Sequence, residues 1–226
     1  MPTSSRPTKN SPYCLLVEGS SDQHAIIHLM KRHPYDWDDA ENTRPFVLSY
    51  DGLANLPKAI TAHKAKQCLG IVVDADEQPE TRWQELSKEL LPIVEQQLPS
   101  QLDPAGLIVK GREPNQSVGV WLMPNNCEKG ALEDLVQELL PKQDCCWELA
   151  REQASAAKGR YGRSSTPHGF ELKSQLHTWL AWQEEPGMSF GQALNKKIEN
   201  SAEHLFNVWT RYSFTNGAWK GLWVGG

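Results

Sequence analysis

Two aspartates separated by one residue follow a short apolar run in the first third of the chain. The run, LGIVV at residues 69–73, is continued by Asp74, Ala75 and Asp76. Side chains alternate along a strand, so carboxylates two residues apart point to the same side of it. Such a pair repels unless a cation or a proton joins the two groups. The pattern predicts a metal site, and the alternative is a turn in which an aspartate caps the next helix.

A glutamate ends another apolar run near the start of the chain. YCLLV at residues 13–17 is followed by Glu18 and then by GSSD, and apolar residues at helical spacing predict a helix after it. Neighbouring strands lie about 4.8 Å apart. If this strand adjoins the one that leads to Asp74, the carboxylates of both strands converge within reach of one or two divalent cations. In the alternative interpretation, Asp22 or a serine before it only caps the helix.

The elements that must position these carboxylates alternate between strands and helices. The run at residues 69–73 is rich in β-branched residues, which is typical of a strand buried on both faces of a parallel sheet. In open α/β sheets, ligands bind where the strands end. The predicted fold class is α/β, with a Rossmann-type, mainly parallel sheet flanked by helices and a C-terminal helical extension. Further strands are expected at residues 46–49, 107–109 and 118–123, with helices between them.

The pattern divides the chain into three parts. Residues 1–12 are rich in Pro, Ser and Thr and are expected to be a disordered lead-in. Residues 13–143 carry the strand and helix patterns of the α/β domain. Residues 144–226 hold six of the nine tryptophans and no convincing strand before their end. Apolar spacing predicts helices at residues 172–180 and 202–212, and we expect this Trp-rich extension to pack on the α/β core.

Two charged segments lie outside the strand ends. Glu133 and Asp134 open a predicted helix, where acidic residues are favourable through the helix dipole alone. The alternative is that they form a third acidic element at the same sheet edge. Lys158, Arg160 and Arg163 lie in the Gly/Ser-rich sequence KGRYGRSS, which has no acidic residue. A flexible basic loop suits phosphate contacts, and the alternative is a solvated loop without a ligand.

The whole-chain composition limits the class of protein. With 226 residues, 39% of them hydrophobic and 23% charged, the chain is typical of a globular protein of one large domain or one domain with an appendage. The net charge of −5 argues against polyanion binding over the whole surface. No apolar run approaches the ~20 residues of a membrane span, and the N-terminus has no signal-peptide pattern. Five cysteines without C-x-x-C spacing indicate reduced thiols in a cytoplasmic protein.

The motifs together resemble those of a known domain family. VEGSSD at residues 17–22 and VVDAD at residues 72–76 are similar to the two signature motifs of the TOPRIM domain, and the resemblance covers residues 13–140. Topoisomerases, primases, recombination-repair proteins and the OLD (overcoming lysogenization defect) nucleases share this domain. The later sequences GVWLMPNN, GALEDL and LAWQEEPG resemble a narrower family of small stand-alone bacterial TOPRIM proteins related to the OLD type.

The resemblance implies roles for the acidic residues. Glu18 matches the general acid/base or metal-binding glutamate of the TOPRIM motif, and Asp74 and Asp76 match the residues that bind Mg²⁺. Asp22 resembles the second acidic residue of the first OLD-type motif. The implied cofactor is one or two Mg²⁺ or Mn²⁺ ions, which is consistent with the preference of hard cations for oxygen ligands.

Two further assignments rest on the OLD-type part of the resemblance. Glu133, with Asp134, resembles the later acidic motif, and Lys173 is the best-placed lysine for a position close to the metals. The chain departs from the large members of the family, because it shows no Walker A motif, no ATPase domain and no separate domain for a tyrosine nucleophile. Strand passage and primer synthesis are therefore not expected.

The function that these residues predict is divalent-metal-dependent phosphodiester hydrolysis on nucleic acid, on DNA rather than RNA, in DNA repair or phage defence. Two alternatives stay open. One is a non-catalytic Mg²⁺-binding module that holds a phosphate ligand or a partner protein, and the other is an enzyme that acts on small phosphorylated molecules. A separate ATPase or other protein is an expected partner. No membrane association is expected, and the sequence leaves the oligomeric state open.

Overall fold

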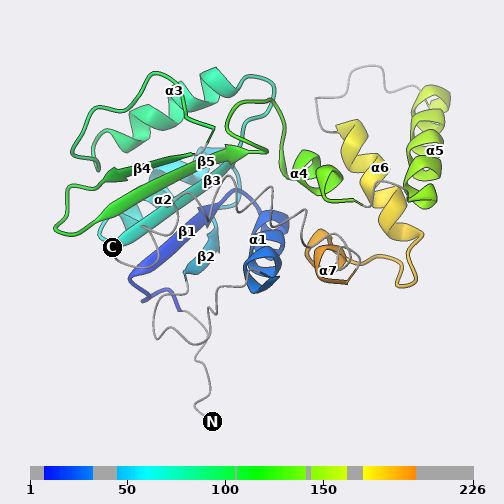
Figure 1. The fold of residues 1–226 in the computed structure, drawn as a ribbon, viewed down its shortest axis with the longest axis horizontal. Helices are drawn as coiled ribbons and strands as arrows, with labels where there is room; N and C mark the ends of the chain where they lie inside the picture. Colours follow the sequence, from blue (N-terminus) through cyan, green and yellow to red (C-terminus); the bar gives the residue numbers. More distant parts are fainter. Residues whose placement is uncertain (1–7, 33–44, 105, 141–143, 162–169, 197–226) are drawn as a thin grey trace, which may run out of the picture.

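The computed structural model describes residues 8–32, 45–104, 106–140, 144–161 and 170–196. It shows an α/β fold in which a five-stranded sheet is flanked by helices (Figure 1). The strands are β1 Tyr13–Val17, β2 Phe46–Ser49, β3 Cys68–Asp74, β4 Leu107–Lys110 and β5 Ser117–Met123. The helices are α1 Ser20–Arg32, α2 Leu56–His63, α3 Pro79–Leu90, α4 Leu132–Glu138, α5 Cys145–Tyr161, α6 Phe170–Ala181 and α7 Phe190–Lys196, with a 3₁₀ turn at Leu53–Asn55.

The sheet has the strand order β2-β1-β3-β5-β4, and its first four members are parallel to one another. Val17 at the end of β1 lies opposite Ser49 of β2 and Val72 of β3. Strand β4 runs antiparallel to β5 at the edge of the sheet. The predicted mainly parallel α/β fold is therefore confirmed. Since β1 adjoins β3, the two apolar runs that lead into acidic residues end side by side.

Strand β3 lies in the centre of the sheet because it can be buried on both faces. Its first six residues, Cys68 to Val73, are all buried, and only Asp74 at its end reaches partial exposure. A strand covered on both sides must be apolar along its whole length, which explains the unbroken apolar run. The first charged residue thus marks the place where β3 leaves the core.

Helices cover both faces of the sheet. Helices α2 and α3 pack on one face, through a core that includes Ile60, Trp83 and Leu86. Helix α1 packs on the other face, with α7 next to it, and α4, α6 and α5 lie beyond the carboxyl ends of the strands (Figure 1). Pro92 follows the end of α3 at Leu90, in line with the helix-breaking effect of proline.

The C-terminal helices share the core on the α1 side of the sheet. Leu176 and Trp179 of α6 are fully buried in one cluster with Val17 of β1 and Met123 of β5. Helix α7 lies so close to α1 that a Cβ at Gly191 would come within 2.8 Å of the His28 ring. The described helices α5 to α7 therefore share buried residues with the sheet and with α1.

Some expectations differ from the structure or lie outside the described residues. The segment predicted to be a basic loop begins within α5. This helix includes Gly159 and ends at Tyr161. Residues 1–7, Arg163 and the helix predicted at residues 202–212 lie outside the described residues. None of the five cysteines, all of which are described, forms a disulfide. No described helix is long and apolar enough to cross a membrane.

Candidate acidic site at the carboxyl ends of the strands

Glu18 and Asp74 bring two carboxylates to the ends of neighbouring parallel strands. Glu18 directly follows β1, and Asp74 is the last residue of β3. The Oε2 atom of Glu18 and the Oδ1 atom of Asp74 are buried, and no described residue forms a hydrogen bond to either; we call such atoms unpartnered. A buried polar atom without a partner costs about 1–3 kcal/mol, and more when it is charged. The two atoms therefore mark a place that suits a cation or a hydrogen-bond donor.

Asp74 lies at the electrostatic centre of this edge. Burial raises the pKa of its carboxyl well above the usual range, and the negative charges of Asp22, Glu18, Glu133 and Asp76 raise it further. Burial is also the largest cause that raises the pKa of Glu18. Carboxylates of four different elements thus act on one another, since Asp22 comes from α1 and Glu133 from α4. We call Glu18, Asp22, Asp74, Asp76 and Glu133 the acidic site.

Asp22 combines a helix cap with membership of the acidic site. Its Oδ2 accepts a hydrogen bond of 3.0 Å from the backbone N–H of Gly19, as in the capping box, where a first-turn side chain reaches back to the N–H that precedes the helix. Burial raises the pKa of Asp22, and the charge of Glu133 adds to the effect. The N–H of Gly19 and the cation of Lys173 act in the opposite direction. Asp22 therefore accepts a backbone hydrogen bond at the start of α1 and also lies close enough to Glu133 and Lys173 for their charges to act on its pKa.

Lys173 enters the acidic site from α6. Its Nζ lies 2.9 Å from Oε1 of Glu133, a buried residue at the start of α4. Burial alone would lower the pKa of Lys173, but the hydrogen bond to Glu133 and the charges of Asp74 and Asp22 raise it overall. The lysine is consequently a permanent cation, and about half of its side chain remains open to solvent.

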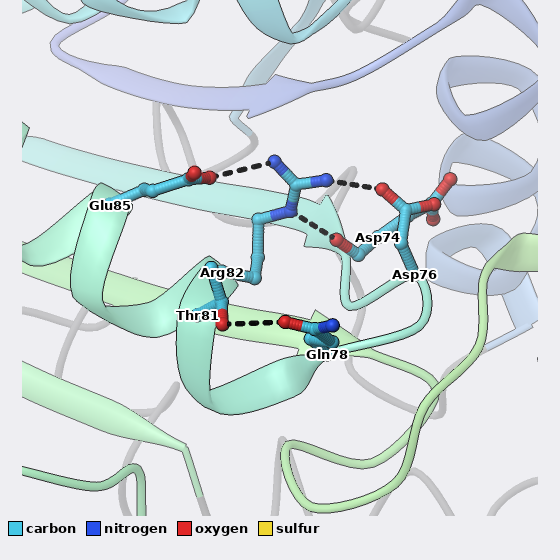
Figure 2. A network of polar contacts seen from close by, with 6 residues as sticks. All are labelled: Asp74, Asp76, Gln78, Thr81, Arg82 and Glu85. Carbon is cyan, nitrogen blue, oxygen red and sulfur yellow. Dashed lines mark hydrogen bonds and ion pairs between the residues drawn. The ribbon is translucent and has the colours of Figure 1, made fainter.

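Asp76 is held by a cation that the sequence analysis did not single out. Arg82 of α3 donates from Nη2 to Oδ2 of Asp76 and from Nη1 to Glu85, at 3.3 Å, and Figure 2 shows the guanidinium between these carboxylates. Its Nε also donates to the backbone oxygen of Asp74, at 3.1 Å. The side chain of Arg82 is 14% exposed and that of Asp76 is 56% exposed. The sequence signal for this ion pair was an arginine in the first turn of the helix that follows the D-x-D sequence.

The backbone conformation of Asp76 marks the end of the extended chain. Its φ of +53° lies in the left-handed region, which ends the extended chain of β3. Asp76 and Gly130 exchange two backbone hydrogen bonds of 2.9 Å, so the loop before α4 holds this turn. The expectation that Asp74 and Asp76 point to one side assumed that the strand continues through both residues. Because β3 ends at Asp74, the alternation of side chains along the strand does not extend to Asp76.

Asp134 has a local role in the structure. Its Oδ2 accepts a hydrogen bond of 2.8 Å from the backbone N–H of Ala131, which satisfies a donor at the start of α4. Its neighbour Glu133 acts on the pKa of Asp74, whereas Asp134 is not among the charges that do so. Of the two acidic residues that open α4, the structure joins Glu133 to the acidic site and uses Asp134 as a cap.

Tyr50 is a second residue that the sequence analysis missed. It directly follows β2, and its backbone N–H donates to the oxygen of Val17 at 3.0 Å. The residue is only 6% exposed, and its hydroxyl is unpartnered among the described residues. Burial raises the pKa of Tyr50, and the charges of Glu18, Asp74 and Asp22 raise it further. A polar aromatic residue at the end of a third parallel strand was the signal for its presence at this edge.

The predicted phosphate-binding cations are not brought to the acidic site by any described contact. Lys158 is exposed on α5, and its Nζ lies 2.7 Å from Oε2 of Glu171 on α6. Arg160 lies in the last turn of α5, and Arg163 lies outside the described residues. Within the described ranges, Lys173 and Arg82 form ion pairs with residues of the acidic site.

The acidic site supplies the donors that a hard cation prefers. Mg²⁺ is bound through oxygen atoms, often by one or two carboxylates together with phosphate groups. The unpartnered oxygens of Glu18 and Asp74 fit that chemistry. Within the described residues, however, no three Asp, Glu, His or Cys side chains converge as a metal-ligand group. The carboxylate oxygens are therefore the type of ligand that Mg²⁺ binds. Their negative charges repel one another when no cation is bound, which explains why they do not converge around one point.

The comparison with protein families identifies the family of this chain. The family model described as "Protein of unknown function (DUF3226)" matches residues 12–214, and the chain belongs to this family. The match spans the acidic site and the C-terminal helices, so the family is defined over both parts of the fold. No match was found among curated proteins or among solved structures.

Proposed function

We propose that this member of the DUF3226 family is a TOPRIM-type enzyme that hydrolyses phosphodiester bonds of nucleic acid with Mg²⁺ or Mn²⁺. One observation carries the proposal: two buried, unpartnered carboxylate oxygens lie at the ends of adjacent parallel strands. The site is at the edge where α/β sheets bind their ligands. Its acids come from segments far apart in the sequence, so the fold itself assembles them.

Glu18 and Asp74 are the residues that we expect to hold one or two divalent ions, with Asp22 and Glu133 beside them. A metal held there would polarise the phosphate and make water a better nucleophile near neutral pH. Glu18 suits proton transfer, because burial raises its pKa toward the pH at which the enzyme would work. Asp76 can join the ligands only when its ion pair with Arg82 opens.

Lys173 supplies the positive charge that phosphodiester cleavage needs. Negative charge accumulates on the phosphate oxygens in the transition state, and a fixed cation beside it lowers the barrier. The ion pair with Glu133 holds the ammonium group at the acidic site, and its raised pKa keeps it protonated. Arg82 is a second permanent cation at the same edge. The site therefore combines candidate metal ligands with candidate phosphate partners.

The setting of the reaction follows from the same proposal. DNA is the preferred substrate over RNA, in repair or in defence against phage, and a separate ATPase or another protein is a candidate partner. The five free cysteines support a reducing compartment such as the cytoplasm.

A non-catalytic module is the second candidate function, and one observation favours it. Lys173 and Arg82 already neutralise Glu133 and Asp76, and the surface cation Lys158 is paired with Glu171. Such internal pairing leaves fewer cations for a long polyanion. A cation together with a small phosphate ligand would suit this arrangement, with or without turnover of the ligand.

Nicking of supercoiled plasmid tests the proposed function. We expect the full chain to nick the plasmid with Mg²⁺ or Mn²⁺ and not with EDTA, and Asp74→Asn to lose at least about 100-fold in rate. Asp51→Asn is the matched control, because Asp51 is exposed, follows β2, and has a φ of +57° that asparagine tolerates. Equal nicking by Asp74→Asn would place the activity elsewhere. Metal binding without nicking would favour the non-catalytic module or a smaller substrate.

A further inference from the structure

Three residues at the ends of the first three parallel strands each carry a buried, unpartnered polar atom. These atoms are the hydroxyl of Tyr50, Oε2 of Glu18 and Oδ1 of Asp74, and none has a hydrogen-bond partner in the described part of the chain. A tyrosine hydroxyl donates a hydrogen bond, whereas ionised carboxylates only accept. One unused donor is therefore buried at the same edge of the sheet as two unused acceptors.

The backbone fixes Tyr50 beside Glu18. The N–H of Tyr50 donates to the oxygen of Val17, and the N–H of Gly52 donates to the oxygen of Glu18, each at 3.0 Å. These bonds continue the pairing of β1 and β2 past the ends of both strands. These backbone hydrogen bonds fix the position of Tyr50 without any contact of its hydroxyl.

Tyr50 belongs to the same buried cluster as the two residues that flank Asp74. These are Val73 and Ala75, on the α2 and α3 side of the sheet. The apolar part of the side chain is therefore satisfied, and only the hydroxyl lacks a partner among the described residues. A phenylalanine would fill the same space, so the hydroxyl calls for a separate explanation.

We propose that Tyr50 is a positioning residue of the acidic site. With Glu18 and Asp74 as ligands of a divalent cation, the hydroxyl of Tyr50 would donate a hydrogen bond to a carboxylate oxygen of one of these two residues. Carboxylates that bind metals are commonly held in this way, and loss of the holding group weakens metal binding by about 10–100-fold. The inference rests on the metal part of the proposed function and does not require that nucleic acid is cleaved.

The proposal predicts that Tyr50→Phe does not lower the stability of the metal-free protein but weakens the binding of the metal. Without metal the hydroxyl has no described partner, so its removal should leave the stability unchanged or raise it. With metal the hydroxyl holds a ligand, so its removal should weaken binding. A merely structural hydroxyl would instead lower the stability of the metal-free protein. The tyrosine acts as a donor throughout, because its raised pKa keeps the proton in place.

The test compares Tyr50→Phe with wild type in the full chain. Mn²⁺ affinity is measured by calorimetric titration, and the melting temperature is measured in EDTA. We expect Mn²⁺ to bind Tyr50→Phe at least about 10-fold more weakly, with a melting temperature in EDTA that is not lowered. Tyr13→Phe is the control, because it removes a hydroxyl at the opposite end of β1, and it should bind Mn²⁺ as wild type does.

Each outcome decides the inference. Equal Mn²⁺ affinity of Tyr50→Phe and wild type, or a lowered melting temperature in EDTA, overturns it. Absence of Mn²⁺ binding by wild type overturns both this inference and the metal-dependent function. If Tyr50→Phe binds Mn²⁺ more weakly and the wild-type protein does not nick plasmid, the role of Tyr50 is supported. Only the proposed hydrolysis is then contradicted.

Discussion

Glu18, Asp22 and Asp74 are carboxyl groups whose protons the folded chain retains more strongly than the unfolded chain does. Burial raises the pKa of each, and neighbouring carboxylates add to it. A folded state that binds more protons than the unfolded state loses stability as the pH rises. These residues therefore make the metal-free fold most stable below the ordinary carboxyl range.

The first prediction concerns pH. In EDTA, the contribution of these carboxyl groups to the free energy of unfolding should be complete below pH ~4 and should decline as the pH rises through their raised pKa values. Mn²⁺ should reduce the decline, because it binds the ionised form. Urea unfolding of wild type and Asp74→Asn over a pH series measures the effect. The variant should show a smaller decline, and an identical pH profile would contradict this account.

The second prediction concerns Lys173. Lys173→Ala should lower the rate of phosphodiester cleavage by about 100-fold, because the charge on the phosphate loses its cation. Mn²⁺ affinity should not fall, since the lysine is not a ligand. Lys158→Ala is the control, because Lys158 also forms an ion pair with a glutamate but lies on α5. Plasmid nicking and calorimetric titration measure the two effects. A nicking rate of Lys173→Ala equal to that of Lys158→Ala would remove Lys173 from the mechanism.

At the scale of single residues, the sequence predicted the positions of those residues whose place depends only on where a strand ends. Glu18 and Asp74 each stand where an apolar run meets a charge, so their place at one sheet edge followed from the parallel arrangement. Tyr50 and Arg82 were missed, because their roles depend on the order of the strands and on the packing of α3. Neither property is visible in the local spacing of residues.

At the scale of elements, the apolar runs predicted the five described strands. The reason is clearest for β3, because a strand covered on both faces must be apolar throughout. The direction of β4 did not follow, since a run of residues such as Leu107–Lys110 carries no mark of its orientation. The basic segment was assigned to a loop for its glycines, but α5 includes Gly159, because the low helix propensity of a single glycine is a weak signal that the rest of the helix can override.

The loop before α4 yields the third prediction. Gly130 has a φ of +149°, and a Cβ there would lie 2.7 Å from Oδ2 of Asp134 and 2.9 Å from Cδ of Pro124. Gly130→Ala should therefore lower the free energy of unfolding by about 1–3 kcal/mol, as measured in urea. It should also weaken Mn²⁺ binding, since Gly130 holds the backbone of Asp76.

Gly52→Ala is the control for that prediction. Gly52 also has a positive φ, of +97°, but no described atom lies within 4 Å of a Cβ at this position. Its substitution adds backbone strain without a clash and should destabilise the fold less than Gly130→Ala does. A larger loss for Gly52→Ala would show that the contacts at Gly130 do not matter.

At the scale of the whole molecule, the C-terminal helices and the sheet share one core. Leu176 and Trp179 of α6 are buried together with residues of β1, α1 and β5. The amphipathic spacing of the extension predicted that it packs on the rest of the chain. It could not show which element receives it, because an apolar helix face fits many surfaces of similar hydrophobicity. The shared core explains how Lys173, far along the sequence, reaches Glu133.

The fourth prediction tests this shared core. Leu176→Ala should lower the free energy of unfolding by about 2–5 kcal/mol, because it opens a cavity at a fully buried position. Leu149→Ala, at a position 48% exposed, should change it by no more than about 0.5 kcal/mol. Circular dichroism and tryptophan fluorescence should report one coincident transition in urea. Separate transitions for the two probes would indicate that the helices unfold independently of the sheet.

The measurement that tests the central claim most directly is the number of Mn²⁺ ions bound at neutral pH, counted by electron paramagnetic resonance. The claim is that the unpartnered oxygens of Glu18 and Asp74 bind a divalent cation. Wild type should bind one or two ions, and Asp74→Asn should bind fewer or bind them at least about 10-fold more weakly. Glu18→Gln should behave in the same way, while Asp51→Asn should match wild type. Equal binding by wild type and Asp74→Asn, or no binding by wild type, would contradict the account.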